Sequence, residues 1–180
     1  CLTTISSLLN SNRNSDLSRK QMEYYLMNYL GIEKIIWLNG AIKGDDTDGH
    51  IDNLARFVNP TTIVYISEDD KSDENYTGLI KVEETLKRAR DQFGKPFTII
   101  PLPTPKIIKD KNFRLPASYA NFYIGNSVVL VPAFQDPNDK IAQDILKIYF
   151  PQKKIIPIDS RTLINGQGGI HCLTQQQPAN

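Results

Sequence analysis

The chain has 180 residues, of which 40% are hydrophobic, and this is enough for one globular domain with its own core. Lys and Arg number 21 against 20 Asp and Glu, so the net charge of +1 gives no reason to expect nucleic acid or an anionic membrane as a partner. The longest apolar runs are a few residues long, too short to span a bilayer, and no secretory signal pattern is present. Two cysteines are too few for a disulfide framework, which favours a reducing, cytoplasmic location.

The first third of the chain predicts a short strand, a helix and a second strand. Residues 1–6 have the pattern of a strand, and 33–38, which includes Trp37, that of a buried strand. Between them a helix is expected from Ser18 to Gly31, because Ser is a favoured helix N-cap and Gly a favoured helix end. One face of this helix carries Met22, Tyr25, Leu26, Tyr29 and Leu30.

The next segment predicts a hairpin followed by a helix and a strand. Residues 51–58 and 61–67 are the expected hairpin strands, joined by an Asn-Pro turn. Helical periodicity then runs over 74–93, and a strand is expected at 97–102. The residues predicted to face inward from this helix are Leu79, Val82, Leu86 and Ala89.

The same order of elements occurs again after a proline-bearing loop at 103–116. Two strands, 118–124 and 127–131, precede a helix at 137–150 and a closing strand at 154–158. The residues predicted to face inward from this second helix are Ile141, Ile145 and Ile148.

This order predicts a repeat-built α/β protein of ββαβ units. The two units begin about 70 residues apart, a period typical of repeat architectures. Residues 1–38 resemble a unit that lacks its first strand, and 170–174 resemble a first strand alone. Because such units stack on one another, we expect residues 1–180 to be a single domain that forms about half of a larger protein.

Three residues suggest thiol chemistry on a cationic substrate. Cys172 lies after two glycines, and His50 and Asp52 lie two apart in an acidic segment. If equivalent strand ends converge on a common axis, these three side chains meet there. A histidine can supply positive charge and shuttle protons for a thiolate, and a carboxylate matches a planar guanidinium. Glycine lets a substrate approach the backbone, which makes Gly169 a candidate substrate-binding position.

Each of these residues also has a purely structural interpretation. Cys172 can be a buried small side chain, His50 a turn residue and Asp52 a surface residue at a strand edge. Alternation along a strand places His171 on the face opposite Cys172, which favours a structural role for it. A zinc site of Asp48, His50, His171 and Cys172 lacks the usual ligand spacing, so no metal is expected.

Two motifs of the chain match the pattern of one enzyme family, Asp46-Thr47-Asp48-Gly49-His50-Ile51-Asp52-Asn53 and Gly168-Gly169-Ile170-His171-Cys172-Leu173-Thr174-Gln175-Gln176-Gln177-Pro178. Shorter matches are Leu2-Thr3-Thr4, Ser7-Leu8-Leu9-Asn10, Asn12-Arg13-Asn14, Ala117-Ser118-Tyr119-Ala120-Asn121-Phe122-Tyr123 and Val131-Pro132. In these residues the chain resembles the agmatine deiminases (agmatine iminohydrolases), which are similar to bacterial peptidyl-arginine deiminases within the guanidine-modifying superfamily. The resemblance runs nearly end to end, and the cysteine motif with its three glutamines is the most specific part.

The resemblance implies a five-bladed α/β propeller (a pentein) with a central active site, of which this chain is the C-terminal part. Cys172 is then the nucleophile on the guanidinium carbon, His50 the general acid/base and Asp52 a guanidinium ligand. Agmatine is hydrolysed through a covalent amidino-cysteine to N-carbamoylputrescine and ammonia, a step toward putrescine, without metal or organic cofactor. The family's other acidic substrate ligands, an Asp and a Glu, have no counterpart in this chain.

Other functions fit the same residues. A related hydrolase acts on peptidyl-arginine, and amidinotransferases use similar thiol chemistry to pass the amidino group to an amine. A non-catalytic fragment or binding module is the alternative from another class. Exposed sheet edges also favour a homo-oligomer.

Overall fold

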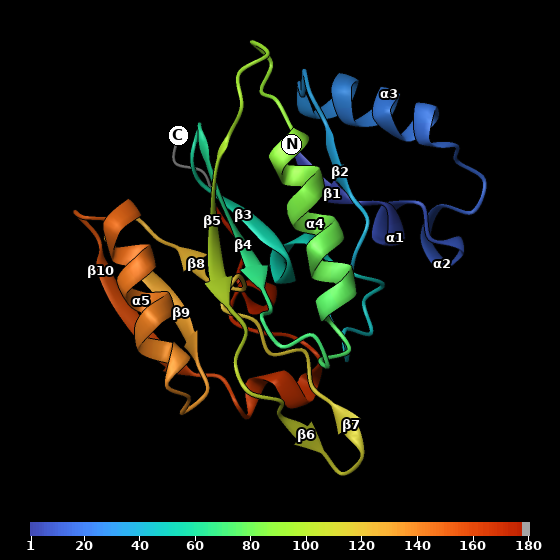
Figure 1. Cartoon of the computed structure of the whole chain (residues 1–180). Helices are drawn as coiled ribbons and strands as arrows, with labels where there is room; N and C mark the ends of the chain where they lie inside the picture. The colour runs from blue at the N-terminus through green and yellow to red at the C-terminus, as the bar shows by residue number, and fades with distance from the viewer. Residues whose placement is uncertain (178–180) are drawn as a thin grey trace.

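Two three-stranded sheets, each with one long helix, form the centre of the chain (Figure 1). The computed structural model describes residues 1–177; residues 178–180, which include Pro178 of the cysteine motif and the end of the predicted domain, lie outside the described residues. The first sheet has the order β3-β4-β5 and the second the order β8-β9-β10. Their elements are β3 (Ala55–Asn59), β4 (Thr62–Ser67), α4 (Tyr76–Arg88) and β5 (Thr98–Pro103), then β8 (Tyr123–Ile124), β9 (Val128–Ala133), α5 (Asn138–Tyr149) and β10 (Lys154–Asp159).

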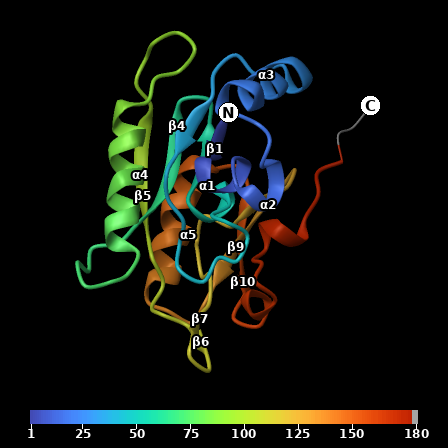
Figure 2. The ribbon, with the colours of Figure 1, turned by 90° about the vertical axis from the view of Figure 1, so that its right-hand side faces the viewer.

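Both sheets are built in the same way. The first two strands pair antiparallel and the last two pair parallel, with the helix as the crossover that a parallel pair requires. The predicted strand–strand–helix–strand order is therefore confirmed for both units. Helices α4 and α5 lie on one side of the sheets and the C-terminal segment on the other (Figure 2).

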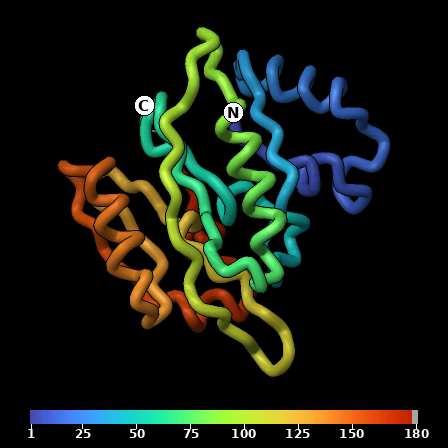
Figure 3. Tube along the Cα trace, viewed as in Figure 1, coloured from blue at the N-terminus to red at the C-terminus, as the bar shows by residue number. Residues whose placement is uncertain are grey.

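An incomplete unit at the N-terminus pairs β1 (Leu2–Thr4) parallel with β2 (Ile36–Leu38). Helix α3 (Arg19–Leu30) has the predicted ends: Ser18 and Gln21 form a capping box, and Gly31 has the left-handed φ of +63° that glycine tolerates. Strand β2 runs alongside α4 (Figure 3), where Ile36 and Leu38 pack in one cluster with Val82 and Leu86. The remaining helices here are α1 (Ile5–Leu8) and α2 (Ser11–Asn14), which replace the end of the strand expected over 1–6.

The apolar face predicted for α3 is largely uncovered in this chain. Met22 is buried, but Tyr25, Tyr29 and Leu30 are exposed, and α3 lies at the edge of the fold (Figure 1). Trp37 is buried as predicted, and its indole N–H donates to Glu23 Oε1 at 2.8 Å.

The main core lies between the two sheets and their helices. Its largest fully buried side chains include Tyr119 and Phe122, which precede β8. Helix α4 buries Leu79, Val82 and Leu86, as predicted. The helix ends at Arg88, so Ala89, which was predicted on the same face, is the extended residue after the helix and is only partly buried. None of the helices within residues 1–177 is both long and apolar enough to cross a bilayer.

The inward face predicted for α5 is wrong by one residue. Ala142 and Leu146 are buried, whereas Ile141 is 49% and Ile148 is 71% exposed; Ile145 packs partly against the core. Successive residues of a helix are rotated by about 100° about its axis. In α5 the predicted stripe (Ile141, Ile145, Ile148) and the buried stripe (Ala142, Leu146) are one residue apart, and both are apolar at helical spacing. Periodicity alone does not distinguish them.

Three predicted strand starts are also wrong. The chain over Ile51–Asn53 forms a 3-10 turn, η1, before β3 begins at Ala55. Residues His171–Leu173 form another 3-10 turn, η3, in place of a strand, after a 3-10 turn η2 at Leu163–Gly166. In the segment 118–124 only Tyr123–Ile124 pairs as a strand.

The loop predicted at 103–116 contains a small hairpin. Strands β6 (Lys109–Asp110) and β7 (Phe113–Arg114) pair antiparallel, and Lys111 at their turn has a φ of +51°. Arg114 donates to Asp73 Oδ1 at 2.8 Å, which fastens the hairpin to the loop before α4.

The α5 register is tested by truncating two aliphatic side chains. Leu146→Ala should lower the free energy of unfolding by about 2–5 kcal/mol, because it opens a cavity in the core. Ile148→Ala, on the exposed face, should change the free energy by about 0.5 kcal/mol or less. Urea unfolding of the complete protein measures both, and an equal loss for the two variants would contradict this register.

Candidate active site

The residues at the candidate site come from three segments that are remote in sequence. Turn η1 supplies Asp52, the segment before β8 supplies Asn121, and turn η3 supplies His171 and Cys172. Cys172 Sγ lies 3.5 Å from Asp52 Oδ2 and 3.3 Å from Asn121 Nδ2, across separations of 120 and 51 residues. The structure thus brings Cys172 and Asp52 into contact.

Asp52 is 8% exposed and has its two carboxylate oxygens in different environments. Oδ2 lies 2.7 Å from His171 Nδ1, while Oδ1 is buried without a hydrogen-bond partner among the described residues. Burial raises the pKa of Asp52, but the hydrogen bonds of His171 and Cys172 and the charges of His171 and Arg56 outweigh it and hold the pKa below its usual value. The carboxylate is therefore ionised, with one oxygen available to a further donor.

Arg56 on β3 is a partly buried positive charge whose field acts on the Asp52 carboxylate. Its Nη1 donates to the Phe122 carbonyl at 2.9 Å, and its guanidinium lies 4.9 Å from the centroid of the Phe122 ring. Burial lowers the pKa of Arg56, and the charges of Asp52 and Cys172 oppose that shift. The sequence analysis did not identify Arg56; a lone arginine in an otherwise apolar strand segment was the available signal.

Cys172 is exposed as a residue, but its sulfur lies among protein atoms. Desolvation raises the pKa of the thiol, the charge of Asp52 raises it further, and the hydrogen bond from Asn121 partly opposes both. The thiol at rest is therefore protonated, and its S–H donates toward Asp52 Oδ2.

His50 lies at the start of η1 but turns its ring toward Arg13. Its Nε2 is 2.8 Å from Arg13 Nη2, and because a guanidinium can only donate, Nε2 is the acceptor and Nδ1 carries the proton of the neutral ring. Among the described residues, the His50 ring makes no hydrogen bond with Cys172 or Asp52. The expected shared face of His50 and Asp52 depended on strand alternation, and the chain here is a 3-10 turn.

His171 contradicts the expectation that it points away from Cys172. In the turn η3 its ring instead reaches the same carboxylate oxygen that faces the sulfur. The alternation argument fails for the same reason as at His50, since no strand forms at 170–174.

The acidic residues before His50 make hydrogen bonds and a turn mainly within their own loop. Asp45 accepts hydrogen bonds from the backbone N–H groups of Thr47 and His50, and Asp48 has a φ of +66°. Within residues 1–177, no group of three or more His, Cys, Asp or Glu side chains has an arrangement that could hold a metal ion.

The two glycines before the cysteine lie against the site. A Cβ on Gly169 would lie 2.5 Å from Asn121 Oδ1, and one on Gly168 would lie 3.1 Å from the Cβ of Cys172. Close packing against Asn121 therefore explains the glycine at 169, and its role in substrate binding stays a prediction.

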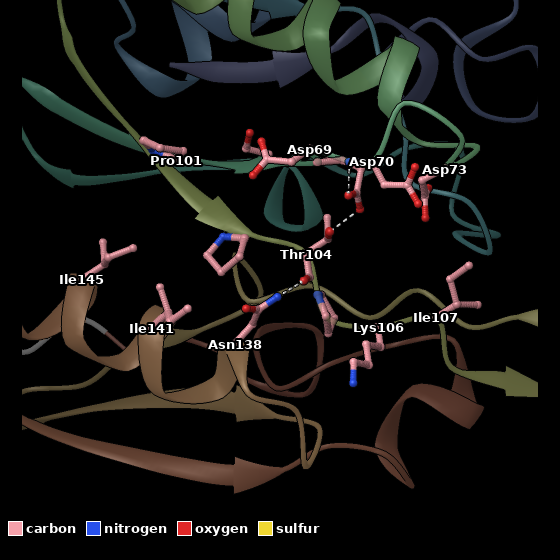
Figure 4. A pocket seen from close by; sticks show the side chains of 14 residues that line it. Asp69, Asp70, Asp73, Pro101, Thr104, Lys106, Ile107, Asn138, Ile141 and Ile145 are labelled. Atoms are coloured by element: carbon pink, nitrogen blue, oxygen red, sulfur yellow. Dashed lines mark hydrogen bonds between the residues drawn. The ribbon is translucent and has the colours of Figure 1, made fainter.

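A separate cavity of about 920 Å³ lies beside α5 and the C-terminal end of β5 (Figure 4). Acidic side chains and prolines line it, and Asn138 Nδ2 donates to the Thr104 carbonyl at 2.8 Å within it. Its lining includes none of the residues around Cys172, and it contains no histidine or cysteine. We therefore place the candidate chemistry at Cys172.

Comparison with known proteins agrees with the sequence motifs. A family model described as Porphyromonas-type peptidyl-arginine deiminase matches residues 1–178. The chain belongs to this family. Of the curated relatives, a Legionella pneumophila protein provisionally named agmatine deiminase is 43% identical over 178 residues, which are 98% of this chain and 51% of that protein. The agmatine deiminase of Stutzerimonas stutzeri is 39% identical and is matched over 99% of this chain and 53% of its own length.

Solved structures of similar proteins have the same fold over the matched part. The Enterococcus faecalis agmatine deiminase gives a TM-score of 0.93 at 32% identity and covers 98% of this chain and 53% of its own. A cysteine-to-serine variant of C. jejuni agmatine deiminase with substrate bound gives 0.88 at 41% identity, over 94% of this chain and 50% of that one. The chain spans about half the length of the relatives it matches.

Packing at Gly169 is tested by adding one methyl group to this family member. Gly169→Ala forces the buried Asn121 side chain to move and should cost about 1–3 kcal/mol of unfolding free energy. Gly166→Ala is the matched control, since its Cβ would meet nothing within 4 Å, and should change stability by about 0.5 kcal/mol or less. Equal unfolding free energies for the two variants would refute this account of Gly169.

The effect of Asp52 on the thiol is tested by alkylation with iodoacetamide, followed on the Cys172 peptide by mass spectrometry. Asp52→Asn removes a negative charge beside the sulfur, so the pKa of Cys172 falls and alkylation at neutral pH becomes severalfold faster. Asp46→Asn removes the same charge from an exposed loop position and should leave the rate unchanged. Slower alkylation of the Asp52 variant would contradict the assigned electrostatics.

Proposed function

We propose that the complete protein hydrolyses agmatine to N-carbamoylputrescine and ammonia, with Cys172 as the nucleophile. The observation that carries this proposal is the contact between Cys172 Sγ and Asp52, whose Oδ1 is buried and has no hydrogen-bond partner in the part of the chain that the structure describes. A planar guanidinium satisfies that oxygen with an N–H donor and brings its carbon toward the sulfur. Relatives named agmatine deiminase at 32–41% identity support the choice of substrate.

Substrate charge also activates the nucleophile in this proposal. At rest, desolvation and the Asp52 charge hold the pKa of Cys172 above its usual value. A guanidinium bound at Asp52 places positive charge beside the sulfur and reverses part of that shift. The thiolate therefore forms only when substrate is bound, and the thiol of the free protein stays protonated.

The reaction proceeds through two displacements at one carbon. His50 accepts the thiol proton as the Cys172 sulfur forms a C–S bond to the guanidinium carbon, which gives a tetrahedral adduct. His50 then returns that proton to a terminal nitrogen of the adduct, the C–N bond to this nitrogen breaks, and ammonia leaves. The remaining amidino-cysteine keeps the alkyl chain of agmatine. Water, deprotonated by His50, adds to the same carbon, and the C–S bond breaks to release the ureido product. The His50 ring must turn from Arg13 to perform these transfers.

The proposal includes the wider architecture. The two complete units and the N-terminal partial unit are blades of a five-bladed propeller, and residues 1–180 are one domain in its C-terminal part. Support comes from relatives about twice as long with TM-scores of 0.88 and 0.93. The protein is cytoplasmic, uses no metal or organic cofactor, acts on a small guanidino substrate and self-associates. The acidic ligands that complete the site lie in the other half.

Peptidyl-arginine deimination is the second candidate. The matching family is described by that activity, and Cys172 is exposed in this chain, which suits a substrate that stays outside a closed pocket. The two activities differ in which ureido product forms. An amidinotransferase is excluded if ammonia is released without an added amine acceptor.

The proposed function is tested by incubating the complete protein with agmatine, arginine and an arginine-containing peptide. Ammonia and a ureido product should form from agmatine, and Cys172→Ala should reduce kcat/KM by at least about a thousandfold, because the nucleophile is lost. Cys1→Ala, which removes the other exposed thiol, should retain full activity. Equal turnover by the Cys172 variant removes the thiol from the mechanism, and faster turnover of the peptide favours the second candidate.

A further inference from the structure

His171 lies next to the nucleophile, yet no step of the proposed reaction uses its ring. We propose that His171 is a positioning residue for Asp52: its ring N–H holds one carboxylate oxygen, so that the other oxygen is presented to the guanidinium of the substrate. The inference rests on the proposed function for the identity of that cation. The bond between the two side chains is a property of this chain and can be measured without substrate.

The hydrogen bond between His171 and Asp52 has a defined direction. His171 Nδ1 lies 2.7 Å from Asp52 Oδ2. An ionised carboxylate can only accept hydrogen bonds, so the proton of this bond is on Nδ1. An N–H bond to a charged oxygen is about twice as strong as one between neutral groups. The imidazole therefore fixes the position of Oδ2 and does more than fill the space beside it.

The backbone around His171 holds the ring in place for this contact. The His171 backbone N–H donates to Asn121 twice, to the side-chain Oδ1 at 2.8 Å and to the carbonyl oxygen at 3.2 Å. The His171 carbonyl accepts from the Thr174 hydroxyl at 2.8 Å and from the Thr174 backbone N–H at 3.0 Å. Because the main chain is fixed on both sides of the residue, the ring donor reaches Asp52 without rearrangement.

Of the charged and titratable groups that the described part of the chain places against Asp52, His171 is the strongest hydrogen-bond donor. These groups are His171 and Cys172 from η3 and Arg56 from β3. The Cys172 thiol is a weak donor and lies 3.5 Å from Oδ2. Arg56 acts on the carboxylate through its charge, because its Nη1 donates to the Phe122 carbonyl. The orientation of the carboxylate is therefore set by His171.

Loss of this donor would have two effects on Asp52. A carboxylate rotates readily about its Cβ–Cγ bond, so without the ring N–H the two oxygens no longer have distinct positions. The effect of burial would also be less opposed, and the pKa of Asp52 would rise from its lowered value. Both effects weaken the binding of a cation, because a rotated or protonated carboxyl group offers no charged oxygen at the position of Oδ1.

The test compares two replacements of His171 that have nearly the same size and shape, in the complete protein. In His171→Asn the Nδ2 donor occupies the place of the histidine Nδ1, whereas in His171→Leu a methyl group does. His171→Leu should lower kcat/KM for agmatine about 10- to 100-fold, the loss expected for a hydrogen bond to a charged group. Most of this loss should lie in KM, because Asp52 holds the cation in the bound complex as well as during the reaction. His171→Asn should lose about threefold or less, since it keeps the donor.

A second measurement follows Asp52 itself and needs no substrate. The Asp52 carboxyl group is titrated by ¹³C NMR, with Asp52→Asn to assign its signal. In His171→Leu the pKa of Asp52 should rise by about one pH unit or more, so the acid limb of the kcat/KM profile should move to higher pH. His171→Asn keeps the N–H donor but lacks the charge of a protonated ring, so its rise should be smaller.

His171→Gln keeps the test available if the leucine variant fails to fold. The His171 side chain is 29% exposed, so a polar side chain can be accommodated there. The glutamine amide lies one bond beyond the place of Nδ1 and leaves Oδ2 without its donor. This variant should therefore behave like His171→Leu in both measurements.

Equal KM values, or equal Asp52 titrations, in the folded asparagine and leucine variants would overturn the proposal, even if the wild-type protein hydrolyses agmatine. A raised Asp52 pKa in His171→Leu of a protein that hydrolyses no agmatine would support the positioning bond and refute the proposed reaction instead. A raised pKa together with a raised KM supports both.

Discussion

The buried carboxylate of Asp52 is the constraint on which the candidate site depends. An ionised carboxylate withdrawn from water requires compensating partners, and here these are His171, Cys172 and the charge of Arg56. Asp52 lies 119 residues before His171 and 120 residues before Cys172, so it is the fold that brings the thiol to the carboxylate. Because the pKa of Asp52 is lowered in the folded state, its contribution to stability is present above the unfolded pKa and is lost as the pH falls through the folded value.

The groups around that carboxylate differ in charge and in whether they donate or accept hydrogen bonds. Oδ2 of Asp52 accepts from His171 and Cys172, and Oδ1 has no partner within residues 1–177; in the proposed function a guanidinium donor binds there. Asn121 offers the only side-chain amide donor to the sulfur among the described residues, and the Gly169 backbone N–H is a further donor. The arrangement keeps the thiol protonated without a cation and provides a fixed donor once a cation arrives, a combination that ties activation to substrate binding.

The sequence predicted the elements better than their orientation. Periodicity and capping correctly gave α3 with its ends at Ser18 and Gly31, and the buried stripe Leu79, Val82 and Leu86 of α4. The inward face of α5 was wrong, because two adjacent stripes are both apolar and only packing selects between them. The chain forms 3-10 turns at Ile51–Asn53 and His171–Leu173, where strands were expected, and these turns carry the side chains of the candidate site. That error reversed the expected directions of His50 and His171. Arg56 lies outside the quoted motifs, and the match over 117–123, which contains Asn121, did not identify this side chain as a neighbour of the sulfur.

The central claim is that the Cys172 sulfur forms a covalent bond to the guanidinium carbon of the substrate. The most direct measurement mixes the complete protein with agmatine for a single turnover, quenches with acid and analyses the Cys172 peptide by mass spectrometry. The account predicts a transient adduct with the mass of agmatine less ammonia on Cys172, which appears before the ureido product and is absent in Cys172→Ala. Full conversion of agmatine with Cys172 unmodified at every quench time, or an adduct on Cys1 alone, would contradict it.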